Sequence, residues 1–152
     1  MREAMTYRVD TATADEIAKH LSLCDRDFVP PLSGRIGIED YAKKMANFAT
    51  RFEAWSAGTL VGLVAVYCND METRVAHITS VSVLREWSGA GIATHLMGLC
   101  IRHAQACGMS RVRLEVSRDN AAAIRLYQKL GFIAGETNTS SIIMDLYMKS
   151  GE

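Results

Sequence analysis

The fold is decided by residues 77–132, which read HITSVSVLREWSGAGIATHLMGLCIRHAQACGMSRVRLEVSRDNAAAIRLYQKLGF. A strand pattern through Ser80–Val83 leads into a glycine turn, Gly89-Ala90-Gly91, and then directly into a long helix. A second strand pattern, Val112–Val116, and a short helix that closes at Gly131-Phe132 follow. Backbone N–H groups are unpaired at the positive end of a helix, where they attract anions. The stretch therefore predicts an anion site at the glycine turn.

Length and composition limit the class of protein. With 152 residues, 49 % of them hydrophobic and 22 % charged, the sequence predicts one globular domain over residues 1–152 and no membrane span. The 17 basic and 17 acidic residues balance, which argues against a nucleic acid or an anionic membrane as partner. The first residues have no apolar core of a signal peptide, so a cytoplasmic protein is expected.

The cysteines and histidines are scattered. Cys24, Cys68, Cys100 and Cys107 form no C-x-x-C pair and lie in apolar segments, so buried free thiols are expected. His95 and His103 are eight residues apart, too far for an i,i+4 metal pair. The sequence therefore predicts no metal site.

The other segments extend this stretch into an α/β domain. A first strand (7–11) and two helices (13–24 and 38–49) precede a meander of three strands (52–56, 60–68 and 76–84), and a hairpin (133–136 and 141–148) ends the chain. The meander is antiparallel, whereas the strand–helix–strand crossover requires a parallel pair. We expect a mixed, mostly antiparallel sheet flanked by four helices, whose last hairpin could pair with a second copy to give a homodimer.

Residues 25–37 interrupt the helical pattern with Pro30-Pro31 and Gly34. They form either a connector pinned by Phe28 and Leu32 or a substrate-facing loop, because loops on a rigid scaffold often carry specificity. On the second interpretation, Asp25, Asp27 and Tyr41 could bind a cationic amine, and the substrate-binding candidates are Phe28, Arg35 and Tyr41.

Two familiar nucleotide-binding loops do not fit the glycine turn. A dinucleotide fingerprint needs a third glycine where Thr94 stands, and a phosphate-binding P-loop needs a Gly-Lys-Ser/Thr run that is not in the sequence.

The turn and the later helix together resemble the GNAT family of N-acetyltransferases. The family's loop pattern, Gln/Arg-x-x-Gly-x-Gly/Ala, falls on Ser88–Ala93, and its pattern Asn-x-x-Ala-x-x-Leu-Tyr-x-x-x-Gly-Phe matches from Asn120 to Phe132. The match covers about a third of the chain, Val81–Phe132, and its spacing is most similar to the branch that acetylates the N-terminal alanine of a ribosomal protein.

The resemblance implies a sheet with a central splay that holds acetyl-CoA as acetyl donor. It implies direct attack on the thioester, in a ternary complex, by an amine from a small molecule or a protein N-terminus. The implied donor-binding residues are Val81, Ser82, Val83, Ser88, Gly89, Ala90, Gly91, Ile92, Ala93, Thr94, Asn120 and Tyr127. A non-catalytic acyl-CoA-binding module is the alternative.

The first position of the loop pattern departs from the family. Ser88 replaces a glutamine or arginine that would reach the pyrophosphate, and a charge-assisted hydrogen bond contributes about 1.5–3 kcal/mol. Donor binding is therefore expected to be weaker by that amount, unless Arg85 or His95 reaches the phosphates.

Three residues have a structural and a catalytic interpretation. Asn120 suits a helix N-cap as well as a contact to the pantetheine arm. Tyr127 could complete an apolar stripe or, as the resemblance implies, protonate the departing thiolate. Glu115 is the candidate base, acting through water if partly desolvated, or else an ion-pair partner of Arg113 or Arg118. The resemblance also implies Val83 N–H as the oxyanion donor.

Overall fold

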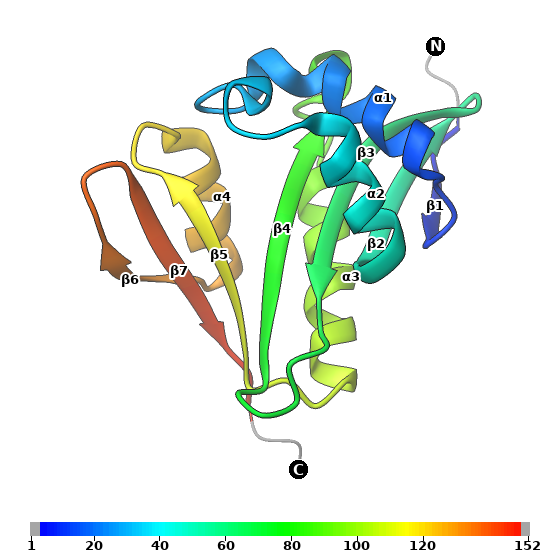
Figure 1. Cartoon of the computed structure of the whole chain (residues 1–152). Helices are drawn as coiled ribbons and strands as arrows, with labels where there is room; N and C mark the ends of the chain where they lie inside the picture. Colours follow the sequence, from blue (N-terminus) through cyan, green and yellow to red (C-terminus); the bar gives the residue numbers. More distant parts are fainter. Residues whose placement is uncertain (1–3, 150–152) are drawn as a thin grey trace.

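The computed structural model describes residues 4–149, and a seven-stranded sheet of order β1-β2-β3-β4-β5-β7-β6 runs through it (Figure 1). Neighbouring strands are antiparallel except β4 and β5, which are parallel as the crossover predicts. The strands are β1 (Thr6–Val9), β2 (Thr50–Ser56), β3 (Thr59–Tyr67), β4 (Val75–Val83), β5 (Arg111–Ser117), β6 (Ile133–Thr137) and β7 (Ser141–Tyr147).

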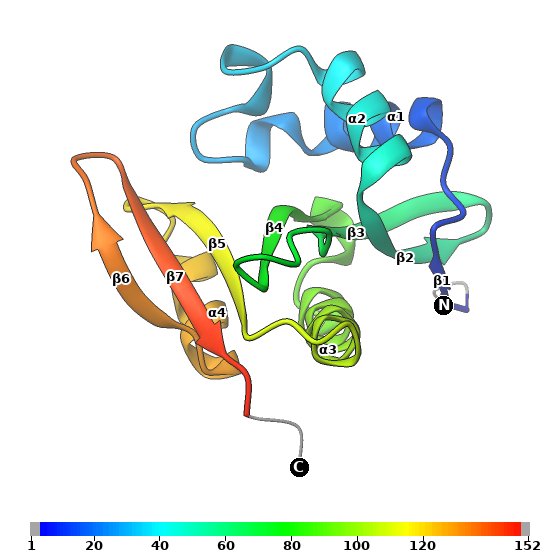
Figure 2. The same cartoon turned by 60° about the horizontal axis from the view of Figure 1, so that its bottom comes forward.

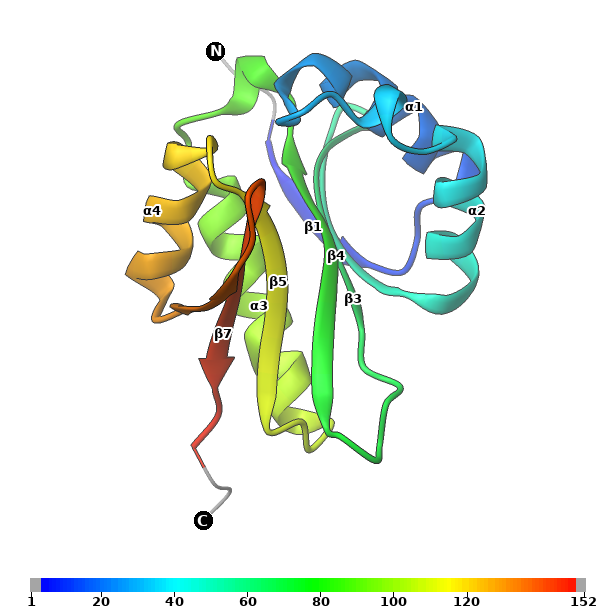
Figure 3. The same cartoon turned by 60° about the vertical axis from the view of Figure 1, so that its left-hand side comes forward.

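Four α-helices cover the sheet, two on each face. Figures 2 and 3 show α1 and α2 on one face and α3 and α4 on the other. The helices are α1 (Ala14–Cys24), α2 (Ile38–Phe48), α3 (Ile92–Ala106) and α4 (Ala121–Leu130), with short 3-10 turns η1 (Asp25–Asp27), η2 (Leu32–Gly34) and η3 (Arg85–Trp87). Within residues 4–149 no helix has the length and apolar character needed to cross a bilayer.

Local signals set the helix ends. Thr13 Oγ1 accepts from Glu16 N at 3.1 Å, and Glu16 Oε1 accepts from Thr13 N at 2.9 Å, which forms a capping box at the start of α1. Gly131 ends α4 at φ 104°, a conformation that glycine adopts without strain. The predicted element order is confirmed, and the observed ends differ from the expected ones by a few residues.

The continuous apolar run of β3 is explained by burial on both of its faces. Leu63 and Ala65 pack with α1 and α2, whereas Val64 and Val66 belong to the core under α3 and α4. At the last strand, Met144 is fully buried and Ile142, Leu146 and Met148 pack against the same core. β6 lies at the edge of the sheet with all five residues exposed, and its pairing with a second copy stays a prediction.

The four cysteines are free thiols, as expected, but they are not equally buried. Cys24 and Cys100 lie in the core, whereas Cys68 and Cys107 are only half-buried. The expectation of four buried thiols is therefore wrong for Cys68 and Cys107, which lie at the end of β3 and the end of α3.

Candidate active site

The two parallel strands at the centre of the sheet separate after three residue pairs. β4 and β5 pair at Val75–Arg111, Ala76–Val112 and His77–Arg113, and beyond these residues the two strands no longer pair with each other. Figure 1 shows β4 and β5 diverging from this point. Beyond His77, no strand of the described chain pairs with the β5-facing edge of β4. This is the predicted central splay, and it leaves a strand edge to which an extended molecule could add.

A β-bulge in β4 accounts for the divergence. Ala65 of β3 pairs with Ser80, but the next residue, Val66, pairs with Ile78, so Thr79 is an extra residue without a partner. Such a residue bends the strand that carries it. The hydroxyl of Tyr41 in α2 donates to the Thr79 carbonyl at 2.5 Å and lies 2.7 Å from Thr79 Oγ1, which holds the bulge in place.

A cavity of about 360 Å³ opens where the two strands part. Side chains from both strands, from the segment between α1 and α2, and from α4 line it. It brings together seven of the candidate donor-binding, substrate-binding and catalytic residues: Phe28, Arg35, Tyr41, Val81, Glu115, Asn120 and Tyr127. The candidate acid, the candidate base and the substrate-loop candidates therefore face one space.

Tyr127 combines its structural and chemical interpretations. Its side chain is 7 % exposed, and its ring centroid lies 5.9 Å from that of Phe132 in the core, yet the residue also lines the cavity. Burial raises the pKa of Tyr127 to about 12, so the phenol stays protonated at neutral pH. A protonated phenol beside a cavity can donate a proton to a leaving group.

Glu115 is not held in an ion pair with either expected arginine. Arg113 Nε bonds Asp145 Oδ1 at 2.9 Å, and Arg118 donates to the Asn138 carbonyl at 2.8 Å. The Glu115 carboxylate instead accepts a hydrogen bond from the Ser141 hydroxyl. The side chain is exposed rather than partly desolvated, and the carboxylate lines the cavity in contact with solvent.

Asn120 is the N-cap of α4, as expected. Its Oδ1 accepts from Ala123 N at 3.2 Å, while the half-buried residue also lines the cavity. The cap uses only the carbonyl oxygen of the amide, so the NH₂ group is available to a ligand. Both interpretations of this residue are compatible in one geometry.

The glycine turn forms a second cavity, of about 260 Å³, at the start of α3. Gly89 and Gly91 have φ near +80°, and Gly91 is the N-cap of α3 without any side-chain hydrogen bond to the helix. The first N–H groups of α3 are thus left for an anion. Seven predicted donor-binding residues line this cavity, together with Trp87: Val83, Ser88, Gly89, Gly91, Ile92, Ala93 and Thr94.

Ser88 lacks the long side chain that the family has at this position, and neither Arg85 nor His95 points to the glycine turn in its place. The Arg85 guanidinium bonds the Asp27 carboxylate, with Nε at 3.1 Å from Oδ1. The His95 ring packs on Tyr7 with centroids 4.0 Å apart. Ser88 Oγ donates to the Arg85 carbonyl at 2.6 Å, so the anion site rests on backbone N–H groups.

The side chain of Ser82 is directed away from the cavity, into a buried contact that the sequence did not indicate. His20 Nδ1 lies 2.8 Å from the Leu60 carbonyl, which can only accept, so Nδ1 carries the proton. Nε2 then accepts from Ser82 Oγ at 2.8 Å. Burial lowers the pKa of His20, which keeps the ring neutral. His20 thereby holds β4 to α1, and the Ser82 side chain is not available to a ligand in the cavity.

The two acidic residues of the substrate loop hold the loop together. Asp25 accepts from the backbone N and the hydroxyl of Ser33, both at 2.7 Å, and Asp27 bonds Arg85. Their expected role as binders of a cationic amine is therefore not supported.

Comparison with known proteins agrees with this geometry. The model of the acetyltransferase (GNAT) family matches residues 14–132. A mycothiol acetyltransferase of Frankia casuarinae is 33 % identical over 116 residues, which are 68 % of this chain and 34 % of that protein. An uncharacterized N-acetyltransferase of Methanocaldococcus jannaschii is 29 % identical over 144 residues, which are 84 % of this chain and 61 % of that protein.

Solved structures show the same fold. The ribosomal-protein-S18-alanine N-acetyltransferase of Escherichia coli superposes with a TM-score of 0.77 at 21 % identity, over 98 % of this chain and 97 % of that one. The chain spans less than two thirds of the length of the curated relatives it matches. Because the family model covers most of the sequence, the chain belongs to the acetyltransferase (GNAT) family.

Proposed function

We propose that the protein transfers an acetyl group from acetyl-CoA to a primary amine by direct attack within a ternary complex. The observation that carries this proposal is the splay between β4 and β5, where Tyr127 and Glu115 line the same cavity. Membership of an acetyltransferase family supports it, as do relatives named N-acetyltransferase or mycothiol acetyltransferase.

The donor would bind along β4 and α3. Its pantetheine would add to the open edge of β4 at Val81–Val83, as an extra strand adds to a sheet. The amide NH₂ of Asn120 would contact the same arm. The pyrophosphate would lie on the backbone N–H groups of Gly89–Thr94, at the positive end of α3.

Three groups of the chain would then assist the transfer. Glu115 takes a proton from the acceptor amine through water and releases it to solvent, and the amine nitrogen forms a bond to the carbonyl carbon. The Val83 N–H holds the oxygen that becomes negative in the tetrahedral intermediate. As the carbon–sulfur bond breaks, Tyr127 donates its proton to the departing sulfur and regains one from solvent.

The acceptor would enter from the side of Phe28, Arg35 and Tyr41, which line the cavity. A small-molecule amine and a protein N-terminus both fit this proposal. We would therefore measure free coenzyme A released from acetyl-CoA over a panel of amino sugars, polyamines, amino acids and short peptides, and confirm the acetylated product by mass spectrometry.

The proposal expects turnover with at least one amine class, and Glu115→Gln should lower kcat/KM by about 10²-fold or more, the contribution typical of a general base. Glu136→Gln, on the exposed strand β6, is the matched control and should leave kcat/KM unchanged. If acetyl-CoA binds but no amine in the panel is acetylated, the non-catalytic acyl-CoA-binding module replaces the enzyme as the better account.

A further inference from the structure

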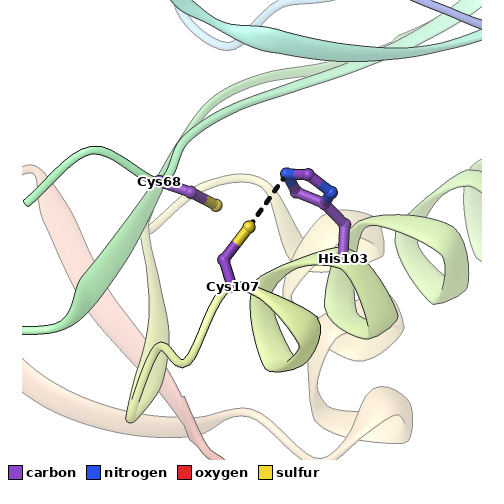
Figure 4. Close-up of side chains that lie close together, drawn as sticks. All are labelled: Cys68, His103 and Cys107. Atoms are coloured by element: carbon purple, nitrogen blue, oxygen red, sulfur yellow. Dashed lines mark hydrogen bonds between the residues drawn. The ribbon is translucent and has the colours of Figure 1, made fainter. Parts of the chain in front are cut away.

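Three side chains that suit a soft metal ion converge away from the acetyl-donor cavities. Cys68 follows the last residue of β3, His103 lies in the last turn of α3, and Cys107 is the C-cap of that helix. Figure 4 shows the two thiols and the imidazole directed toward one another. Their ligand atoms all lie within 4.8 Å of one another, and all three residues are half-buried.

The spacing of these atoms is close to that of a tetrahedral site. With Zn–S near 2.3 Å and Zn–N near 2.0–2.1 Å, tetrahedral angles place S and N about 3.6 Å apart and two S atoms about 3.8 Å apart. Cys107 Sγ lies 3.4 Å from His103 Nε2. The His103 ring is also oriented by Phe52, with ring centroids 5.5 Å apart in an edge-to-face arrangement. Small side-chain rotations would therefore suffice to enclose an ion.

The position in the fold favours a cation. The negative end of a helix dipole attracts positive charge, and α3 has 15 residues that all add to this dipole. The same helix presents its positive end to the glycine turn, about 22 Å away at 1.5 Å per residue. None of the three residues lines the cavity that Tyr127 and Glu115 share.

We propose that Cys68, His103 and Cys107 bind one zinc ion, with solvent as the fourth ligand. Imidazole and thiolate together select zinc over magnesium or calcium, and two thiolates balance its double charge. On binding, the two thiols release two protons to solvent, while neutral His103 contributes the Nε2 lone pair. The bound ion ties the end of α3 to the end of β3, two segments that are 35 or more residues apart in the sequence.

The test uses the full chain, purified with a phosphine reductant so that no disulfide forms. Chelator-treated protein is titrated with zinc at micromolar concentration, and metal content and melting temperature are measured. We expect about one zinc per chain and a raised melting temperature. With cobalt as a probe, a thiolate-to-metal absorption and a tetrahedral d–d band should appear.

Variants localise the site. Cys68→Ser, Cys107→Ser and His103→Gln should each raise the Kd for zinc by about 100-fold or more. Replacing a residue that only hydrogen-bonds a metal ligand already costs about 10–100-fold in affinity. Cys24→Ser and His95→Gln keep the three ligands and should bind zinc like the wild type. In the wild-type protein, zinc should protect Cys68 and Cys107 from alkylation but leave the labelling of Cys24 and Cys100 unchanged. This measurement does not depend on whether a variant folds.

Two results would overturn the proposal. One is a chain that takes up much less than one zinc at micromolar concentration and shows no shift in melting temperature. The other is zinc binding that Cys24→Ser weakens as much as Cys68→Ser does. Neither result would bear on acetyl transfer, because the cluster shares no residue with the proposed catalytic site.

Discussion

Replacing Tyr127 by Phe removes the proposed acid while leaving the packing of the ring. The side chain is 7 % exposed and contacts Phe132, and phenylalanine keeps these apolar contacts. The lost hydroxyl should change the free energy of unfolding by no more than about 1 kcal/mol. General acid catalysis contributes about 10²–10⁴-fold, so kcat should fall by about 10²-fold or more. The KM for acetyl-CoA should change little, because the proton is given to the leaving sulfur during the reaction.

The raised pKa of this tyrosine makes the prediction sharper. With a pKa of about 12, only about 0.1 % of Tyr127 is ionised at pH 9, whereas an ordinary tyrosine would be about 10 % ionised. The wild-type kcat should therefore not fall through loss of this proton up to about pH 10.

The assay is steady-state release of free coenzyme A, followed with a thiol reagent from pH 6 to pH 10. Tyr147→Phe is the matched control, since Tyr147 is 58 % exposed on β7 and does not line the cavity. It should keep the wild-type kcat. A Tyr127→Phe enzyme within about threefold of the wild-type kcat would refute the assignment of Tyr127 as the acid.

Three further substitutions test the scaffold around the donor. Gly62→Ala would place a Cβ 2.7 Å from Ile92 Cγ2. We expect the free energy of unfolding measured in urea to fall by about 1–3 kcal/mol, and acetyl-CoA to bind more weakly because the start of α3 shifts. An unchanged free energy of unfolding would contradict this. Tyr41→Phe removes the hydrogen bond to the Thr79 carbonyl and should lower the free energy of unfolding by about 1 kcal/mol, whereas no loss would show that the bulge does not need it. Ser88→Arg should lower the Kd for acetyl-CoA by about 10–150-fold in calorimetry, and an unchanged Kd would mean that the loop does not hold the pyrophosphate.

Elements that depend on neighbouring residues could be predicted from the sequence. The start of α1 follows from Thr13 and Glu16 three residues apart, and the end of α4 follows from Gly131. Tyr127 and Asn120 could be placed in a site because their spacing matches a family pattern. These signals lie within a few residues of the feature that they determine.

Features that depend on pairing over long distances could not be predicted. The bulge at Thr79 is a property of the β3–β4 register, which no run of residues encodes locally. The sequence offered two arginines as partners of Glu115, but the fold brings Ser141, 26 residues away, to its carboxylate.

The proximity of Cys68 to His103 and Cys107 could not be predicted for the same reason. The His103–Cys107 spacing of i,i+4 was visible, but Cys68 joins them only through the packing of β3 against α3.

Hydrogen exchange with acetyl-CoA tests most directly the claim that the splay between β4 and β5 binds the acetyl donor. Amide exchange would be measured in saturating acetyl-CoA and compared with the exchange in coenzyme-free buffer. The account predicts slower exchange over Val81–Val83, on the open edge of β4, and over Gly89–Thr94 at the start of α3. Unchanged exchange in both segments at a concentration where acetyl-CoA binds, or protection confined to other parts of the sheet, would contradict it.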